Sequence, residues 1–124
     1  MTLALWIVQG LLALAFIMAG FMKAFQPVER LRERMSWSRH VTPPLIRLIG
    51  TLEILGALGL ILPVATHILP WLTPLAALGL VLTMIGAIVL HLRLQERSLV
   101  GLPLVLLLLA LFVAIGYLVL VPVA

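Results

Sequence analysis

The chain has 124 residues, of which 65% are hydrophobic and only 10% are charged, and its formal net charge is +4. A soluble domain of this size cannot bury so much apolar surface, because small domains have a high ratio of surface to volume. The chain has no cysteine, which excludes disulfide scaffolds, thiolate metal sites and thiol redox relays. Its basic residues flank apolar runs, so we expect anionic lipid headgroups as their counter-charge and no nucleic-acid partner.

Four apolar runs are each long enough to cross the roughly 30 Å hydrocarbon core of a bilayer as a helix. We therefore predict an all-α integral membrane protein, with one domain over residues 1–124 that forms an antiparallel bundle of four transmembrane helices. The predicted spans cover about residues 3–25, 44–62, 71–92 and 102–121.

The segment between the first two spans is charged and has helical periodicity. Pro27 is well placed at a helix start, and Val28, Leu31 and Met35 fall on one face at helical spacing. Trp37 lies nearby and suits a membrane interface. The pattern predicts a short amphipathic helix that lies on the membrane surface.

The distribution of basic residues predicts the orientation of the bundle. All eight Lys and Arg residues lie in the loops after spans one and three, or in the adjoining helix ends. The connector of residues 63–70, on the other side, has none. The positive-inside rule then places both charged loops in the cytoplasm and both termini outside.

Glu53 is the most informative residue in the chain, because it lies about nine residues into span two. An ionised carboxylate at that depth costs a few kcal/mol or more, so it should face the bundle and be paired or protonated. Gly50, Gly56 and Ala57 flank it on the same helical face and let another helix approach closely. Glu53 either binds a ligand or exchanges protons, or else it is a neutral side chain that serves assembly alone.

Four further residues should lie in the same, cytoplasmic half. Lys23 can reach Glu53 from the adjacent antiparallel helix, and Thr83 should lie at the depth of Glu53. His91 suits a proton carrier, a hydrogen-bond donor or an interface residue. Arg93 has a simpler explanation, because it can extend to the lipid headgroups and anchor a helix end. The predicted catalytic residues are Glu53, His91 and Lys23, and the predicted ligand-binding residues are Glu53, Lys23, His91, Thr83, Gly50, Gly56 and Arg93.

Other kinds of site are excluded by spacing. His40, His67 and His91 do not have the spacing of metal ligands, so no metal site is expected. No Gly-rich phosphate loop or nucleotide fingerprint occurs, and no motif indicates a cofactor. The small-residue faces, which include Gly79 and Gly86, suit internal packing and homodimerisation equally well.

Three segments resemble the DoxX-like family of small bacterial four-helix membrane proteins. Residues 19–25 are similar to the family's Gly-x-x-Lys at the end of the first span. Residues 50–56 are similar to its Glu between glycines in span two, and residues 87–93 to its His-x-Arg at the end of span three. One departure is Thr-Pro-Pro at residues 42–44, where many relatives have Gly-x-Pro.

The resemblance implies a four-helix bundle in the bacterial inner membrane. The family's name comes from a relative associated with thiosulfate:quinone oxidoreductase, so a quinone or a similar isoprenoid is the ligand class to test. The resemblance implies little about activity, because one fold hosts many functions.

Three functions follow as hypotheses. The leading one is a membrane-embedded binding or accessory subunit for a quinone- or isoprenoid-like molecule, with a soluble redox partner at its basic loops. The second is an enzyme that acts on a hydrophobic substrate by general acid–base chemistry centred on Glu53. The third is a small proton-coupled exporter, ranked last because in that class the essential Glu belongs to span one and the charge bias is weak.

Overall fold

The computed structural model describes residues 2–34 and 41–120, and all the regular structure in these residues is helical. Four segments are long and apolar enough to cross a membrane, which confirms the four predicted spans. The helices are α1 (Thr2–Phe25), α2 (Val28–Arg34), α3 (Pro43–Thr66), α4 (Leu72–Arg93), η2 (Arg97–Leu99), α5 (Gly101–Ile115) and η3 (Gly116–Leu120).

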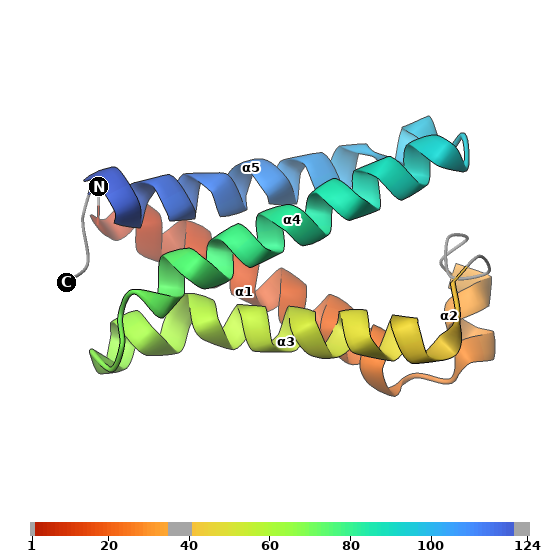
Figure 1. Ribbon diagram of the computed structural model, residues 1–124, viewed down its shortest axis with the longest axis horizontal. Coiled ribbons are helices and arrows are strands. Elements are labelled where there is room, and N and C mark those ends of the chain that lie inside the picture. The colour runs from red at the N-terminus through yellow and green to blue at the C-terminus, as the bar shows by residue number, and fades with distance from the viewer. Residues whose placement is uncertain (1, 35–40, 121–124) are drawn as a thin grey trace.

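The long helices form an antiparallel bundle (Figure 1). Helix α1 packs most extensively against α3, and α4 against α5, while α3–α4 contacts join the two pairs. Toward the end of the bundle where α2 lies, the α1–α3 pair separates from the α4–α5 pair (Figure 1). A cavity, described below, lies between the pairs at that end.

Each long helix buries one stripe of side chains and exposes the rest. The buried core combines small and large apolar residues, among them Leu12 and Phe16 of α1, Leu60 of α3 and Leu80 of α4. Large apolar side chains such as Leu82, which is 69% exposed, cover the outer surface. Such a surface suits contact with lipid tails and does not suit water.

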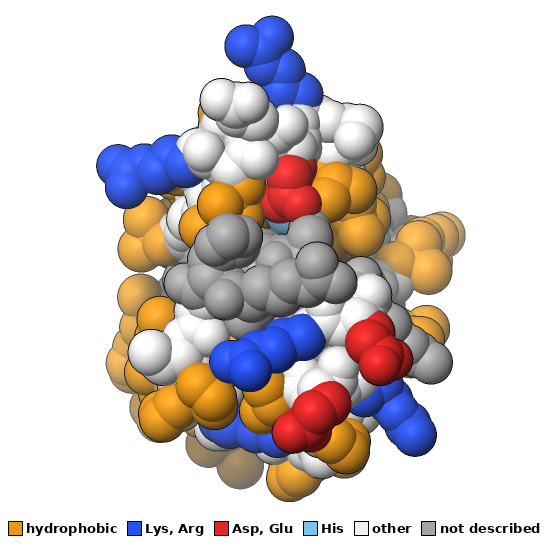
Figure 2. All heavy atoms as spheres, turned by 90° about the vertical axis from the view of Figure 1, so that its right-hand side faces the viewer, with side chains coloured by type: hydrophobic (Ala, Val, Ile, Leu, Met, Phe, Trp, Pro, Cys, Tyr) orange, Lys and Arg blue, Asp and Glu red, His pale blue; other side chains and the backbone are white. Residues whose placement is uncertain are grey.

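Charged side chains gather at the end of the bundle that carries α2 and the α4–α5 connection (Figure 2). Helices α1 and α3 meet there through α2, and α4 meets α5 through η2. The positive-inside prediction places this end in the cytoplasm, and the orientation stays a prediction.

A short helix, α2, follows the first span in the segment where the sequence predicts one. Leu31, on its predicted apolar face, is fully buried in the protein. Met35 and Trp37, the other predicted members of this face, lie outside the described residues. The placement of α2 on a membrane surface stays a prediction.

Helix α3 is longer than predicted, because it continues through Pro63 and ends at Thr66, before His67 adopts a left-handed conformation (φ 58°). Proline has no N–H, so the Gly59 carbonyl cannot receive the usual hydrogen bond from residue 63. The Thr73 hydroxyl of α4 donates to that carbonyl at 3.0 Å instead. The freed acceptor is thus satisfied by a neighbouring helix, and the helix need not stop at the proline.

Replacing Thr73 with valine should therefore lower the free energy of unfolding by about 0.6–1.7 kcal/mol, the range measured for hydrogen bonds between membrane helices. Thr66→Val is the control, because the Thr66 hydroxyl donates within its own helix, to the Leu62 carbonyl at an exposed site. Equilibrium unfolding in mixed detergent micelles measures both changes. Equal effects of the two substitutions would contradict this account of Pro63.

A second buried polar contact lies at the end of the bundle away from the charges. The Tyr117 hydroxyl donates to Gln9 Oε1 at 2.5 Å, and Gln9 Nε2 donates to the Leu60 carbonyl at 2.9 Å. Tyr117 belongs to η3, a π-helical turn that extends α5. These bonds tie α1, α3 and the end of the fourth span together.

Candidate functional site

A contact between glycines positions the site. A Cβ atom on Gly50 of α3 would lie 2.6 Å from the Ala24 nitrogen and 2.7 Å from the Gly20 carbonyl oxygen of α1. A Cβ atom on Gly20 would lie 2.7 Å from the Gly50 carbonyl oxygen. The backbones of α1 and α3 thus touch where these two glycines meet, and only glycine fits at either position.

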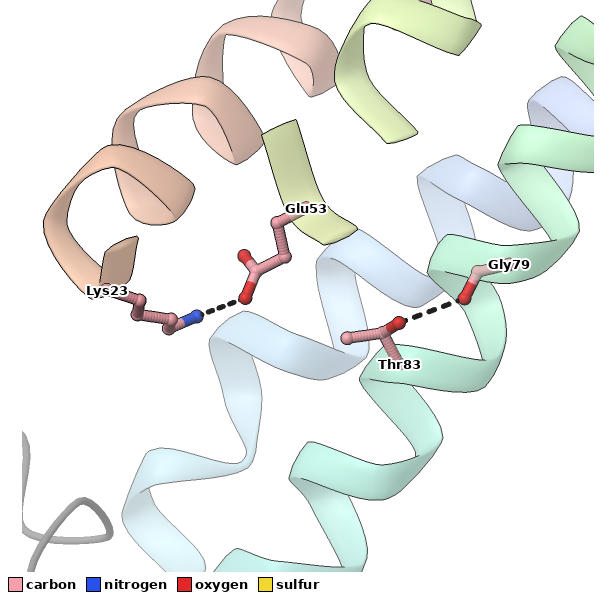
Figure 3. Close-up of polar contacts among 4 residues, drawn as sticks. All are labelled: Lys23, Glu53, Gly79 and Thr83. Carbon is pink, nitrogen blue, oxygen red and sulfur yellow. Dashed lines mark hydrogen bonds and ion pairs between the residues drawn. The ribbon is translucent and has the colours of Figure 1, made fainter. Parts of the chain in front are cut away.

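Lys23 and Glu53 each follow one of these glycines by three residues, and so they emerge beside the contact. Lys23 Nζ lies 2.5 Å from Glu53 Oε1, and the two side chains point toward each other (Figure 3). Glu53 is only 1% exposed, and the Lys23 side chain is 13% exposed. The contact that the sequence predicts between these two residues is present, as a buried ion pair between the first two spans.

The second carboxylate oxygen of Glu53 differs from the first. Glu53 Oε2 is buried and accepts no hydrogen bond from residues 2–34 and 41–120. Buried polar atoms in folded proteins almost always have a partner, so an unpaired carboxylate oxygen requires an explanation. The Lys23–Glu53 contact thus leaves half of the carboxylate without a partner among the described residues.

Arg47 supports the pair from one turn before Gly50. Its guanidinium donates to the Lys23 carbonyl at 2.9 Å. That carbonyl lies in the last turn of α1, where the helix leaves its carbonyls without intrahelical partners. Arg47, which was not among the predicted site residues, therefore holds the backbone of Lys23 in place.

A cavity of about 780 Å³ opens between the two helix pairs at the charged end. All four long helices line it, mostly with apolar side chains. Its ionisable and hydroxyl-bearing lining residues are Lys23, Glu53, Thr83, His91 and Ser98. An apolar lining with a few polar groups is typical of small-molecule sites, and the volume of this cavity lies within their usual range.

His91 lies near the end of α4 and is 92% buried, given an exposed fraction of 8%. Its Nδ1 atom lies 3.2 Å from Glu96 Oε1. Gln95 adopts a left-handed conformation (φ 60°), and the Glu96 N–H donates to the His91 carbonyl at 2.8 Å. This turn folds Glu96 back over His91, and Glu96 was not among the predicted site residues.

The other predicted site residues are placed in different ways. Thr83 lines the cavity, but its hydroxyl donates to the Gly79 carbonyl of its own helix at 3.0 Å (Figure 3). Gly50 packs against α1, as described above, and Gly56 faces Leu80 of α4. Arg93 is exposed and is absent from the cavity lining. The structure therefore brings Lys23, Glu53, Thr83 and His91 to one cavity, while Gly50 and Gly56 pack helices together.

No cluster of three or more His, Asp or Glu side chains suited to a metal ion occurs in residues 2–34 and 41–120. His40 of the sequence-based argument lies outside these residues, and His67 lies in the α3–α4 turn at the opposite end from His91.

Comparison with known families agrees with the resemblance found in the sequence. The model of the DoxX-like family matches residues 7–113. The chain belongs to the DoxX-like family. Among curated proteins and solved structures, none matches it. In this DoxX-like protein the three segments that carry the resemblance contribute Lys23, Glu53 and His91. These residues lie far apart in the chain and line one cavity.

Proposed function

We propose that this DoxX-like protein binds an amphiphilic small molecule of the quinone or isoprenoid class in the cavity between its helix pairs. The observation that carries the proposal is the buried Lys23–Glu53 pair, both of whose residues line a mostly apolar cavity. The polar head of such a molecule would contact the Lys23–Glu53 pair, and its apolar tail would lie along the apolar side chains of the lining.

The energetics of the pair favour binding over a purely structural role. Burying two charges in a membrane protein is costly, and apolar side chains of similar size hold helices together at least as well. Small residues already bring α1 and α3 into contact at Gly20 and Gly50, without any help from charge. A buried ion pair that adds cost to a well-packed helix contact is best explained by a ligand that uses it.

The cavity also has a route for such a molecule. Leu45 of α3 and Leu102 of α5 both line it and are exposed, at 46% and 69%. Both side chains are apolar, so we expect a lipid-like molecule to enter past them from the bilayer. Entry from the membrane suits a ligand that has little solubility in water.

Mass spectrometry of the small molecules that co-purify with the protein tests the proposal. Wild-type protein should carry an amphiphile that Glu53→Gln loses by about tenfold or more, since a hydrogen bond to a charged group is replaced by a weaker neutral one. Glu33→Gln is the matched control, because Glu33 is exposed on α2 and lies outside the cavity lining.

A second variant blocks the cavity without touching the ion pair. Gly86 of α4 lines the cavity and has open space where a Cβ would lie, so Gly86→Phe should fill it. Gly79→Phe makes the same change seven residues away, at a site with equally open space outside the lining. If all these folded preparations carry the same bulk phospholipid and nothing else, the binding proposal is wrong.

The same geometry supports a second candidate function. Lys23, Glu53 and His91 line one cavity, so a bound substrate would meet a carboxylate, an amine and an imidazole, the groups of general acid–base catalysis. Turnover of an epoxide, an enone or a quinone analogue by the pure protein, abolished in Glu53→Gln, distinguishes this enzyme from a binding subunit.

A further inference from the structure

We infer that Lys23 is a nucleophile, and that the cavity takes an amphiphile with an aldehyde or ketone head, which Lys23 binds covalently as an imine. The inference rests on the proposed function and names the chemistry of the head group. It follows from the kind of basic residue that lines the cavity, and from what that residue contacts.

Lys23 is the only lysine in the chain, and the other seven of its eight Lys and Arg residues are arginines. Lys23 lines the cavity, whereas none of the arginines in residues 2–34 and 41–120 does. An arginine guanidinium stays protonated in proteins, but a lysine amine can lose its proton and then attack a carbonyl carbon. The one basic side chain that can form an imine therefore lies where a membrane-borne molecule would bind.

The pairing of Lys23 with Glu53 also favours a chemical role for the amine. An arginine in place of Lys23 could pair with both oxygens of the carboxylate through its planar guanidinium. Lys23 contacts Oε1 at 2.5 Å, and Oε2 accepts no hydrogen bond from the described part of the chain. Lysine is thus the weaker residue for holding α1 to α3, so its presence indicates a function that arginine cannot perform.

Glu53 can carry out the proton transfers that imine formation requires. A proton passes from Nζ to Oε1 across their contact and leaves two uncharged groups, which apolar surroundings tolerate better than two ions. The Nζ lone pair then bonds to the carbonyl carbon, and a proton of the amine moves to the carbonyl oxygen, which becomes a hydroxyl. Glu53 returns its proton to this hydroxyl, the C–O bond breaks, and water leaves.

The product is an iminium ion at Nζ beside the Glu53 carboxylate. The pair therefore ends with the same charges with which it began, and the step consumes no other reactant. Water hydrolyses imines, and the mostly apolar lining, which includes Phe16, Ala87 and Leu90, reduces the access of water to the product.

Reductive trapping with 4-octyloxybenzaldehyde tests the inference in the purified full-length protein in detergent micelles. Sodium cyanoborohydride reduces an imine to a stable secondary amine, and mass spectrometry of peptides locates the adduct. Arg97→Lys is the matched control, because it adds an exposed lysine to the same molecule. Lys23 should be modified about a hundredfold faster than the introduced lysine, since a positioned acid or base contributes about 10²–10⁴-fold. Equal rates, or faster modification at position 97, overturn the inference.

Two glycine substitutions, made in the Arg97→Lys background, show whether the cavity causes the difference. Gly86→Phe fills the cavity and should lower the rate at Lys23 to that of the introduced lysine. Gly79→Phe lies outside the lining and should leave the rate at Lys23 unchanged. The same fast rate in both variants would overturn the assignment of the reaction to the cavity.

The absorption spectrum tests the role of Glu53. A protonated aromatic imine absorbs at longer wavelength than the neutral imine, so the wild type with the aldehyde should show the long-wavelength band. Glu53→Gln removes the counter-charge of the iminium ion, so the band should move to shorter wavelength. An unchanged band in the folded variant overturns the role of Glu53, and the trapping experiment does not depend on whether this variant folds.

A second probe separates this inference from the proposed function. The alcohol 4-octyloxybenzyl alcohol cannot form an imine, so its retention by the protein measures binding alone. If the wild type retains the alcohol above the Gly86→Phe background but forms no Lys23 adduct with the aldehyde, the imine is wrong and a cavity that binds amphiphiles remains. Retention of neither probe above that background overturns both.

Discussion

Replacing Lys23 with methionine should lower the free energy of unfolding by about 3–5 kcal/mol, which is the usual cost of removing one partner of a buried ion pair. The substitution leaves the Glu53 carboxylate, only 1% exposed, without its counter-charge. Methionine keeps a long apolar stem, so the loss reports the charge and not the packing. This is the largest effect of any single substitution proposed for the bundle.

The double variant Lys23→Met with Glu53→Gln tests whether the loss comes from the pair. With the carboxylate gone, the methionine no longer faces an uncompensated charge, and the double variant should be more stable than Lys23→Met alone. The coupling energy should reach about 1–3 kcal/mol. Unfolding in mixed detergent micelles measures it, with Arg97→Met as a control because Arg97 is exposed in η2.

If Lys23 and Glu53 do not interact, the unfolding free energies of the variants should show it. If the two substitutions have additive effects, or if Lys23→Met is as harmless as Arg97→Met, the short Lys23–Glu53 contact does not persist in the folded protein. The proposed site would then lose the counter-charge beside Glu53.

Much of the fold follows from physical rules that a sequence displays directly. Twenty apolar residues can satisfy their backbone in a bilayer only as a helix, so hydropathy suffices to predict the four spans. The Lys23–Glu53 contact was also predictable, because antiparallel neighbours place the end of the first span beside the first turns of the second. Depth along a helix, at 1.5 Å per residue, is the only measurement that this argument needs.

The remaining details depend on partners that sequence spacing does not reveal. Continuation of α3 through Pro63 depends on Thr73, a hydroxyl from another helix. The His91–Glu96 contact depends on the left-handed backbone conformation of Gln95. Glycine is the usual residue in that conformation, so a glutamine there does not predict a turn. Gln9 accepts a hydrogen bond from Tyr117, which lies 108 residues later in the chain, and the sequence around either residue does not predict this contact.

Gly50 illustrates why site residues are harder to assign than spans. A glycine beside a membrane carboxylate suits either a ligand or a helix contact, and the sequence-based hypothesis included it among the ligand-binding residues. In the structure Gly50 instead touches the backbone of α1. Its influence on the site is therefore indirect: it sets the spacing at which Lys23 reaches Glu53.

Replacing Gly50 with alanine should lower the free energy of unfolding by about 1–3 kcal/mol, the usual cost of overpacking a tight contact. The added methyl would lie 2.6 Å from the Ala24 nitrogen, and backbone atoms cannot move aside as a flexible side chain can. Alanine elsewhere in a helix is the more favourable residue by up to about 1 kcal/mol, so the sign of the effect is diagnostic.

Two other glycines form a graded control for this substitution. A Cβ on Gly56 would meet Leu80 Cδ2 at 2.8 Å, the end of a side chain that can rotate, so Gly56→Ala should cost less than Gly50→Ala. A Cβ on Gly10 meets nothing within 4 Å, so Gly10→Ala should be neutral or stabilising. Gly50→Ala should also lower the amount of co-purifying amphiphile, because α1 must shift and carry Lys23 away from Glu53. Equal effects at the three positions would mean that the α1–α3 backbone contact does not set the geometry of the site.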